Sequence, residues 1–129
     1  MVAVDTNVLV RLLVRDDEIQ FKSALAIFRD QKVFLPDSVL LETEWVLRFA
    51  YEYPPEEVCS GLRRALGLKN VFVEDPTRIA KVIAWHEAGL DFADALHLAG
   101  SEHLSSLKTF DRAFVKQSKG LSACKASAP

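Results

Sequence analysis

Short apolar runs that alternate with longer helical patterns constrain this chain more than any other feature. Three runs of three apolar residues occur, Val2–Val4, Val33–Leu35 and Val71–Val73, and the more polar segment Leu107–Phe110 is a fourth candidate strand. Each is followed by a stretch whose apolar residues recur at helical spacing, and a run this short and apolar is typical of a buried strand. Strands separated by helices indicate βαβ units, so we predict an α/β fold with a mostly parallel central sheet and helices on both faces.

The length of 129 residues suits one domain with a core of its own. We predict that this domain covers residues 1–118. The remaining segment, 119–129, is rich in Ser, Ala and Lys, and we expect it to be either a short edge strand or disordered. Gly89 is predicted to end the helix that begins after Asp75.

Composition excludes several classes of protein. The formal net charge is -2, so no overall basic character points to long duplex DNA. Cys59 and Cys124 lie far apart without the spacing of a zinc or redox motif. No apolar run approaches the roughly 20 residues of a membrane span, and no secretory signal is visible. We therefore expect a cytoplasmic protein that does not associate with membranes.

Two aspartates follow predicted strands. Asp5 ends the first run, and Asp111 follows the fourth. Ligands of parallel α/β sheets bind beyond the carboxyl ends of the strands, so both side chains are candidates for a site. Taken singly, a turn residue for Asp5 and a helix N-cap for Asp111 are equally good interpretations. Thr6 is the predicted cap of the helix that follows Asp5.

Two glutamates on the helix after Pro36 receive different interpretations. Glu42 shares a helical face with apolar residues, where an unpaired carboxylate is costly unless it binds a metal or a cation. The apolar neighbours are Val39, Val46 and Phe49. Glu44 faces elsewhere and can pair with Arg48 four residues on, which predicts a solvated ion pair. Glu42 is thus the candidate site residue, with a buried salt bridge to an arginine as the structural alternative.

Asp91 and Asp94 stand at the start of another predicted helix. Asp91 is the expected N-cap, and a carboxylate at the position of Asp94 also favours the helix dipole. Asp94 lies one turn before His97 in a stretch made otherwise of Ala and Leu, so we expect it to point toward packed surface. It is the fourth candidate.

Other kinds of site find little support. The three histidines, His86, His97 and His103, lack metal-ligand spacing, and no glycine-rich phosphate loop or nucleophile elbow occurs. An aspartyl-phosphate enzyme or receiver domain would also place acids at strand ends. It is disfavoured because Asn7 stands where such a site requires a second acid.

Four segments together resemble the PIN-domain nucleases, and more narrowly the VapC-type toxins of VapBC toxin–antitoxin modules. They are Val-Asp-Thr-Asn-Val-Leu-Val at 4–10, Leu-Leu-Glu-Thr-Glu-Trp-Val-Leu at 40–47, Asp-Phe-Ala-Asp-Ala-Leu-His at 91–97 and Thr-Phe-Asp-Arg at 109–112. The resemblance covers the chain to about Ser118. The family commonly ends in an apolar strand, whereas Gly120–Pro129 is a poor one.

The resemblance implies a three-layer α/β/α sandwich and an endoribonuclease that depends on Mg²⁺, with Mn²⁺ as a substitute. It places the four acids of this family at Asp5, Glu42, Asp94 and Asp111. It further implies a homodimer, a VapB-like antitoxin that blocks the site, and a tRNA or rRNA substrate whose cleavage stops translation.

Chemistry suggests how the acids divide their roles. Mg²⁺ usually keeps several waters and binds one or two carboxylates directly. We assign Asp5 and Asp94 as direct metal ligands, and Glu42 and Asp111 as residues that bind through water or position the attacking water. Three cations near these acids are the predicted RNA contacts: Arg11, Arg15 and Arg112.

Two alternatives remain open. A housekeeping PIN ribonuclease would share fold and site but have no antitoxin, so a neighbouring gene for a short DNA-binding protein discriminates the two. A catalytically silent RNA-binding or scaffolding domain would have to explain four retained acids, and failure to bind Mn²⁺ would support it.

Overall fold

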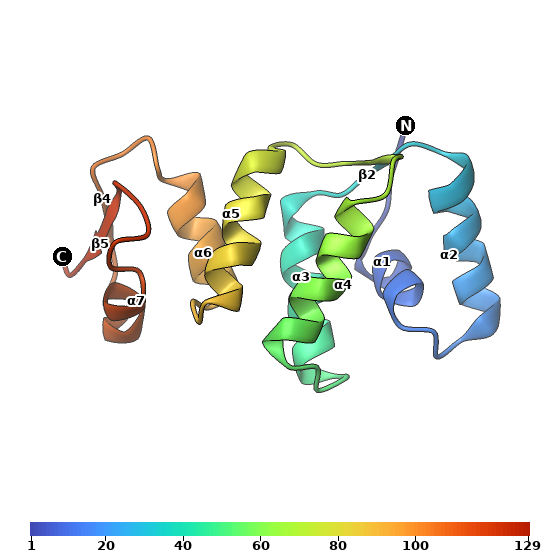
Figure 1. Ribbon diagram of the computed structural model, residues 1–129, viewed down its shortest axis with the longest axis horizontal. Helices are drawn as coiled ribbons and strands as arrows, with labels where there is room; N and C mark the ends of the chain where they lie inside the picture. The colour runs from blue at the N-terminus through green and yellow to red at the C-terminus, as the bar shows by residue number, and fades with distance from the viewer. The chain divides into compact units, whose positions relative to one another are not determined.

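The computed structural model describes all of residues 1–129, and the chain forms two compact units (Figure 1). The first unit spans Met1–Glu74 and the second spans Asp75–Pro129. Each unit contains helices and a small parallel sheet. They are described in turn.

The first unit contains three strands and four helices. In chain order they are β1 (Val2–Ala3), α1 (Thr6–Leu13), α2 (Glu18–Asp30), β2 (Val33–Phe34), α3 (Asp37–Phe49), α4 (Pro55–Leu66) and β3 (Val71–Phe72). The strands pair in the order β1-β2-β3, and both pairings are parallel. Val33 in β2 stands opposite Val2 in β1 and Val71 in β3. These strands lie within the first three apolar runs of the sequence.

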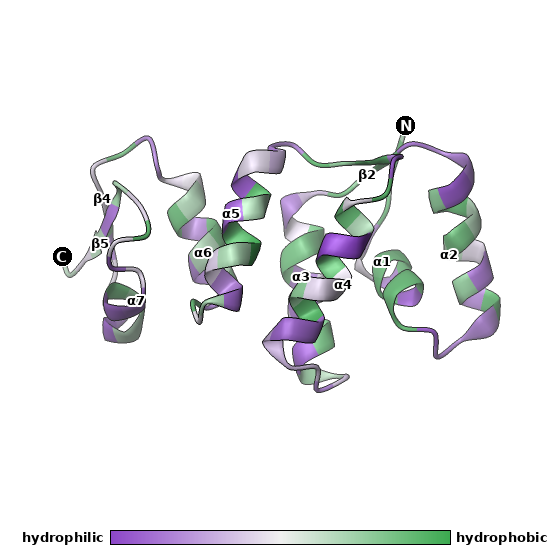
Figure 2. Cartoon of the chain, viewed as in Figure 1, coloured by the Kyte–Doolittle hydropathy of each residue, from purple (hydrophilic) through white to green (hydrophobic).

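The core of the first unit is built from aliphatic side chains of every helix. Helix α1 packs on α2 and α3, and α3 packs on α4. Fully buried side chains include Leu9, Leu35, Leu40, Leu47 and Leu62. Figure 2 shows hydrophobic and hydrophilic bands alternating along α2 and α3, as expected of helices that bury one stripe.

The second unit contains three helices and two strands. They are α5 (Pro76–Glu87), α6 (Phe92–Gly100), β4 (Ser106–Lys108), α7 (Arg112–Gln117) and β5 (Lys125–Ser127). Helix α5 packs along α6, and β4 pairs in parallel with β5 so that Leu107 stands opposite Ala126. Strand β5 thus lies in the predicted tail and gives β4 its partner.

The turn between α5 and α6 depends on Gly89, which has a φ of +118°. The amide of Gly89 donates to His86 O, and that of Leu90 donates to Trp85 O, each at 3.0 Å. These two bonds satisfy carbonyls at the helix end and require a residue that tolerates positive φ. Gly89 ends the helix as predicted.

All three strand pairings are parallel, which confirms the predicted α/β class. None of the helices combines the length and the hydropathy that crossing a membrane requires.

Candidate active site

Asp5 lies two residues after the end of β1 and is the N-cap of α1. Its Oδ1 accepts a hydrogen bond from the amide of Val8 at 3.2 Å, and its side chain is exposed. The prediction that Thr6 caps this helix is therefore wrong. Asp5 takes the cap because its backbone is extended, whereas Thr6 is already the first helical residue. The cap uses one carboxylate oxygen, and no bond from another residue engages the second.

A pocket of about 380 Å³ opens beside Asp5, between α1 and α2. Its polar lining includes Asn7, Gln20 and Ser23, and its apolar lining comes from Val8, Ala24 and Ile27. A volume of this size lies in the range of small-molecule sites. Carbonyl, amide and hydroxyl groups in a partly apolar pocket suit a nucleoside.

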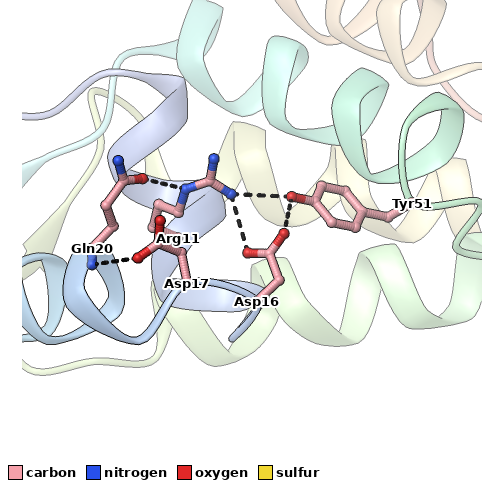
Figure 3. Close-up of polar contacts among 5 residues, drawn as sticks. All are labelled: Arg11, Asp16, Asp17, Gln20 and Tyr51. Atoms are coloured by element: carbon pink, nitrogen blue, oxygen red, sulfur yellow. Dashed lines mark hydrogen bonds and ion pairs between the residues drawn. The ribbon is translucent and has the colours of Figure 1, made fainter.

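Arg11 lines this pocket and takes part in a network of polar contacts (Figure 3). Its Nη1 donates to Asp16 Oδ1 and to the hydroxyl of Tyr51, each at 3.1 Å, and its Nε donates to Gln20 Oε1. The Tyr51 hydroxyl in turn donates to Asp16 Oδ2 at 2.7 Å, which lowers the pKa of Asp16. The guanidinium is thereby fixed at the pocket wall, and the Gln20 amide is oriented with it.

The two glutamates of α3 lie in environments opposite to those expected from the sequence. Glu44 is buried, with 1% of its side chain exposed, whereas Glu42 is exposed. Arg48 donates to both carboxylate oxygens of Glu44, through Nε at 2.8 Å and Nη2 at 3.1 Å. The Glu44–Arg48 pair itself was predicted, but the expectation that it is solvated is wrong. So is the expectation that Glu42 lies on the buried face.

The buried stripe of α3 explains the difference. It contains Val39, Leu40, Thr43, Glu44 and Leu47, while Phe49 is 57% exposed. Because Phe49 was counted as a core residue, the predicted buried stripe lay too far around the helix, on the side of Glu42. The bidentate partner allows a carboxylate to be buried, because its charge and lone pairs are satisfied. Leu40 and Leu47, at four residues before and three after Glu44, are the sequence signal that identifies the true stripe.

Asp94 lies in the first turn of α6, one turn after Asp91. Asp91 is the N-cap, as predicted, and accepts from the Asp94 amide at 3.2 Å. The Asp94 side chain is half-buried. Burial raises the pKa of Asp94, and the neighbouring charges of Asp91 and Asp111 raise it further, opposed only by His97. The second unit thus places two carboxylates close enough to Asp94 to repel its charged form.

Asp111 connects β4 to α7 and caps the helix. Its Oδ1 accepts from the Phe114 amide at 3.1 Å, and its own amide donates to Thr109 Oγ1 at 3.0 Å. The side chain is exposed. Like Asp5, Asp111 uses one oxygen to cap a helix beyond the end of a strand, so both interpretations drawn from the sequence apply to it.

The predicted RNA-binding arginines differ in their surroundings. Arg15 is ion-paired with Glu18 at 2.6 Å and lies over the ring of Phe21, and Arg11 is engaged as described. Arg112 is exposed and forms no ion pair or side-chain hydrogen bond. Arg112 is therefore the one cation of the three that can meet a phosphate without giving up a carboxylate.

The donor set suits a hard cation. Neither unit by itself gathers three or more His, Cys, Asp or Glu in an arrangement that could hold a metal ion. The half-buried Asp94 carboxylate, destabilised in its charged form by two neighbouring acids, is nevertheless of the kind that a divalent cation neutralises. Carboxylate oxygens are the ligands that Mg²⁺ and Mn²⁺ prefer.

The match to known families decides the assignment. Residues 2–120 match the PIN domain family. The chain belongs to this family. The match confirms the resemblance to PIN domains and a PIN-like α/β/α fold, and it indicates a nuclease of a kind that generally depends on a metal. No curated protein was similar enough to the chain to count as a match.

Sequence reasoning selected four candidate acids but did not reveal the pocket beside Asp5. Gln20 and Ser23 lie on α2, and Tyr51 follows α3. Their spacing carries no motif, because only the packing of α2 and α3 on α1 brings them near Arg11. The run Asp16-Asp17-Glu18 after Arg11 and Arg15 was the one available sign of an ion-pair network.

Proposed function

We propose that this PIN domain is a magnesium-dependent endoribonuclease whose catalytic residues are Asp5, Glu42, Asp94 and Asp111. The observation that carries the proposal is the state of Asp94, which is half-buried and surrounded by repulsive charge. A fold that places a carboxylate in such a position favours a cation beside it. Membership of the PIN family makes a phosphodiester the natural substrate.

The proposed roles follow from the surroundings of each acid. Asp5 and Asp94 would hold the ion, since each has a carboxylate oxygen that no hydrogen bond within the protein occupies. Glu42 and Asp111, both exposed, bind through water or orient the attacking water. A bound Mg²⁺ or Mn²⁺ supplies positive charge that stabilises the charge developing on phosphate during an in-line displacement.

The cations and the pocket serve the RNA. Arg112 contacts a phosphate oxygen, and Arg11 and Arg15 can do so by exchanging a carboxylate for a phosphate. The pocket of about 380 Å³ beside Asp5 receives a nucleoside flanking the scissile bond. Because water attacks, its oxygen bonds to phosphorus as the bond to the 3′-oxygen breaks. The products then carry 5′-phosphate and 3′-hydroxyl ends.

The biological setting that we propose is a type II toxin–antitoxin system. The segments at 4–10, 40–47, 91–97 and 109–112, which resemble VapC-type toxins, support this setting. On this proposal the protein is a cytoplasmic homodimer that cleaves tRNA or rRNA, and a VapB-like antitoxin inhibits it. Growth arrest on expression, relieved by the product of a neighbouring short open reading frame, is the expected result. A housekeeping ribonuclease would cause no arrest.

End-mapped cleavage of total RNA tests the nuclease. The wild type is compared with Asp94→Asn in Mg²⁺, Mn²⁺ and EDTA. Asp75→Asn is the control, because Asp75 is likewise an aspartate at the start of a helix, α5, but belongs to no proposed site. We expect discrete cuts with 5′-phosphate ends from the wild type and Asp75→Asn, and none from Asp94→Asn or in EDTA. Cyclic 2′,3′-phosphate ends would refute the mechanism. Absence of metal-dependent cutting by the folded, inhibitor-free protein would favour the RNA-binding alternative.

A further inference from the structure

The last part of the chain concentrates positive charge. Residues 103–129 contain five of the 16 Lys and Arg but only one of the 18 Asp and Glu. The five are Lys108, Arg112, Lys116, Lys119 and Lys125, and all are exposed. The net charge of -2 conceals this segment, because acids predominate in the rest of the chain.

These cations are not used to neutralise acids of the protein. Lys108 donates to Ser127 Oγ at 3.0 Å, and the other four form no ion pair or side-chain hydrogen bond. Four arginines of the first unit behave differently, since Arg11, Arg15, Arg29 and Arg48 each pair with a carboxylate. A set of unpaired, exposed cations is available to an anion from outside.

An exposed aromatic ring stands within this basic segment. Phe110 is 89% exposed, the highest value among the large hydrophobic side chains. It lies between β4 and α7, directly before Asp111 and two residues before Arg112. A ring with so little burial contributes almost nothing to the core and is accessible to another molecule.

Two hollows flank this position in the second unit. One, of about 340 Å³, is lined by Thr109, Phe110, Arg112, Val115 and Ala128. The other, of about 530 Å³, includes Lys119, Lys125 and the hydroxyls of Ser118, Ser122 and Ser127 in its lining. Val115 lines both, which makes them neighbours. Aromatic, cationic and hydroxyl groups therefore line two hollows that adjoin at Val115.

We propose that this surface, formed by Phe110, Arg112, Lys119 and Lys125, binds single-stranded RNA outside the four acids. A base stacks on Phe110, and the flanking phosphates meet the cations. This combination is typical of sites for single strands, since every base offers a π-face and the backbone offers a phosphate at each step. An acidic protein partner would need the cations but not the ring. The inference deepens the proposed function, because it rests on an RNA substrate.

The position of the surface predicts its use. Phe110 is the chain neighbour of Asp111, so a base stacked there belongs to a nucleotide close to the scissile bond. Stacking requires an unpaired base, so the surface selects loops and single strands over duplex RNA. Cleavage within a loop follows from substrate binding and needs no sequence-specific hydrogen bond.

The test measures direct binding of a fluorescein-labelled U12 oligonucleotide by fluorescence anisotropy. EDTA is present so that the RNA is not cleaved. We compare the wild type with Phe110→Ala, Phe110→Trp and the double variant Lys119→Ser/Lys125→Ser. Ile19→Ala is the control for the ring, because Ile19 is 81% exposed on α2. Lys32→Ser/Lys69→Ser, two exposed lysines of the first unit, is the control for charge.

We expect Phe110→Ala to weaken binding about 5- to 150-fold, the effect of losing one stacked base, and Phe110→Trp to restore it. The double lysine variant should weaken binding and reduce the slope of log K against log salt by about 0.7 for each phosphate that the variant no longer neutralises. Both controls should bind as the wild type does. Melting temperatures should be unchanged throughout, since every altered side chain is exposed.

Wild-type affinity in Phe110→Ala would overturn the proposal, as would equal losses in the two double lysine variants. Failure of Phe110→Trp to bind better than Phe110→Ala would exclude stacking. If poly-glutamate binds in place of U12 and depends on Lys119 and Lys125, the surface recognises an acidic protein and the proposal is wrong. The outcome is separable from the nuclease proposal. Binding through Phe110 without any metal-dependent cutting would refute only the nuclease, and cutting with unchanged binding in Phe110→Ala would refute only this inference.

Discussion

Two carboxylates of this PIN domain lose water on folding, with opposite consequences. Asp94 is half-buried among acids, which raises its pKa. Glu44 is almost fully buried, yet both of its oxygens accept hydrogen bonds from Arg48. A buried charge is tolerated when it is paired and is costly when it is not. Folding alone therefore does not favour the charged form of Asp94, whereas it does favour the paired carboxylate of Glu44.

Replacing Asp94 with Asn should stabilise the metal-free protein. A raised pKa in the folded state means that the protonated form is favoured there. The stability that protonated Asp94 contributes is fully present below the ordinary Asp pKa of about 3.9. It is lost as the pH rises through the raised pKa of Asp94 in the folded protein. Asp94→Asn cannot ionise, so in EDTA its melting temperature should exceed that of the wild type at pH 8. The difference should shrink as pH falls toward about 4.

Asp30 gives a control of opposite sign, because the hydrogen bond from Arg29 lowers its pKa. Asp30→Asn should leave the melting temperature at pH 8 unchanged or slightly lower. Thermal denaturation of both variants between pH 4 and pH 8 measures the effect. A lower melting temperature for Asp94→Asn than for the wild type at pH 8 in EDTA would show that this carboxylate stabilises the fold rather than serving a site.

Replacing Arg48 should cost more stability than replacing its partner Glu44. Arg48→Met leaves the Glu44 carboxylate buried without its bidentate partner, which we expect to cost about 3 kcal/mol in the free energy of unfolding. Glu44→Gln retains the volume and one acceptor, so about 1–2 kcal/mol is expected. Urea unfolding measures both. Glu42→Gln, on the exposed side of α3, should stay within about 0.5 kcal/mol of the wild type. A loss under about 1 kcal/mol for Arg48→Met would contradict this account.

At the scale of the elements, what sequence predicts depends on how local the cause is. The first three strands, the Gly89 helix end and the Asp91 cap follow from apolar runs and capping chemistry, and all were predicted. The buried stripe of α3 was not, because an exposed Phe49 resembles a core residue and a paired Glu44 resembles a surface one. For the segment that contains β5, the sequence left two predictions open, a short edge strand or disorder. The residues of β5 have low apolar content, and pairing with β4 determines its structure.

Strand β5 should determine the stability of the second unit. Removing residues 125–129 deprives β4 of its only partner strand. Besides the β4–β5 ladder, it removes the bonds from Lys125 N–H to Ser105 O and from Thr109 N–H to Ser127 O. We expect a loss of about 2 kcal/mol and of amide protection at Thr109. Hydrogen exchange measures the latter. Removing only residues 128–129, beyond β5, is the matched control. Retained protection after the longer deletion would show that β4 does not need β5.

At the scale of the whole molecule, the fold class and the family followed from the order of motifs along the chain. The alternation of strands and helices predicted parallel pairing, and four separate segments predicted the PIN domain. The surroundings of the acids required the structure. Capping by Asp5 and Asp111, and the repulsion at Asp94, depend on backbone geometry and burial that composition does not reveal.

The concentration of lysine after residue 103 also affects how the protein behaves in solution. With a net charge of only -2, copies of the chain repel each other weakly, whereas the basic segment of one copy attracts the acidic remainder of another. Such attraction acts over about 30 Å in 10 mM salt but only about 10 Å in 100 mM. Dialysis into dilute buffer near the isoelectric point of 5.9 should therefore cloud a concentrated sample, and added salt should clear it.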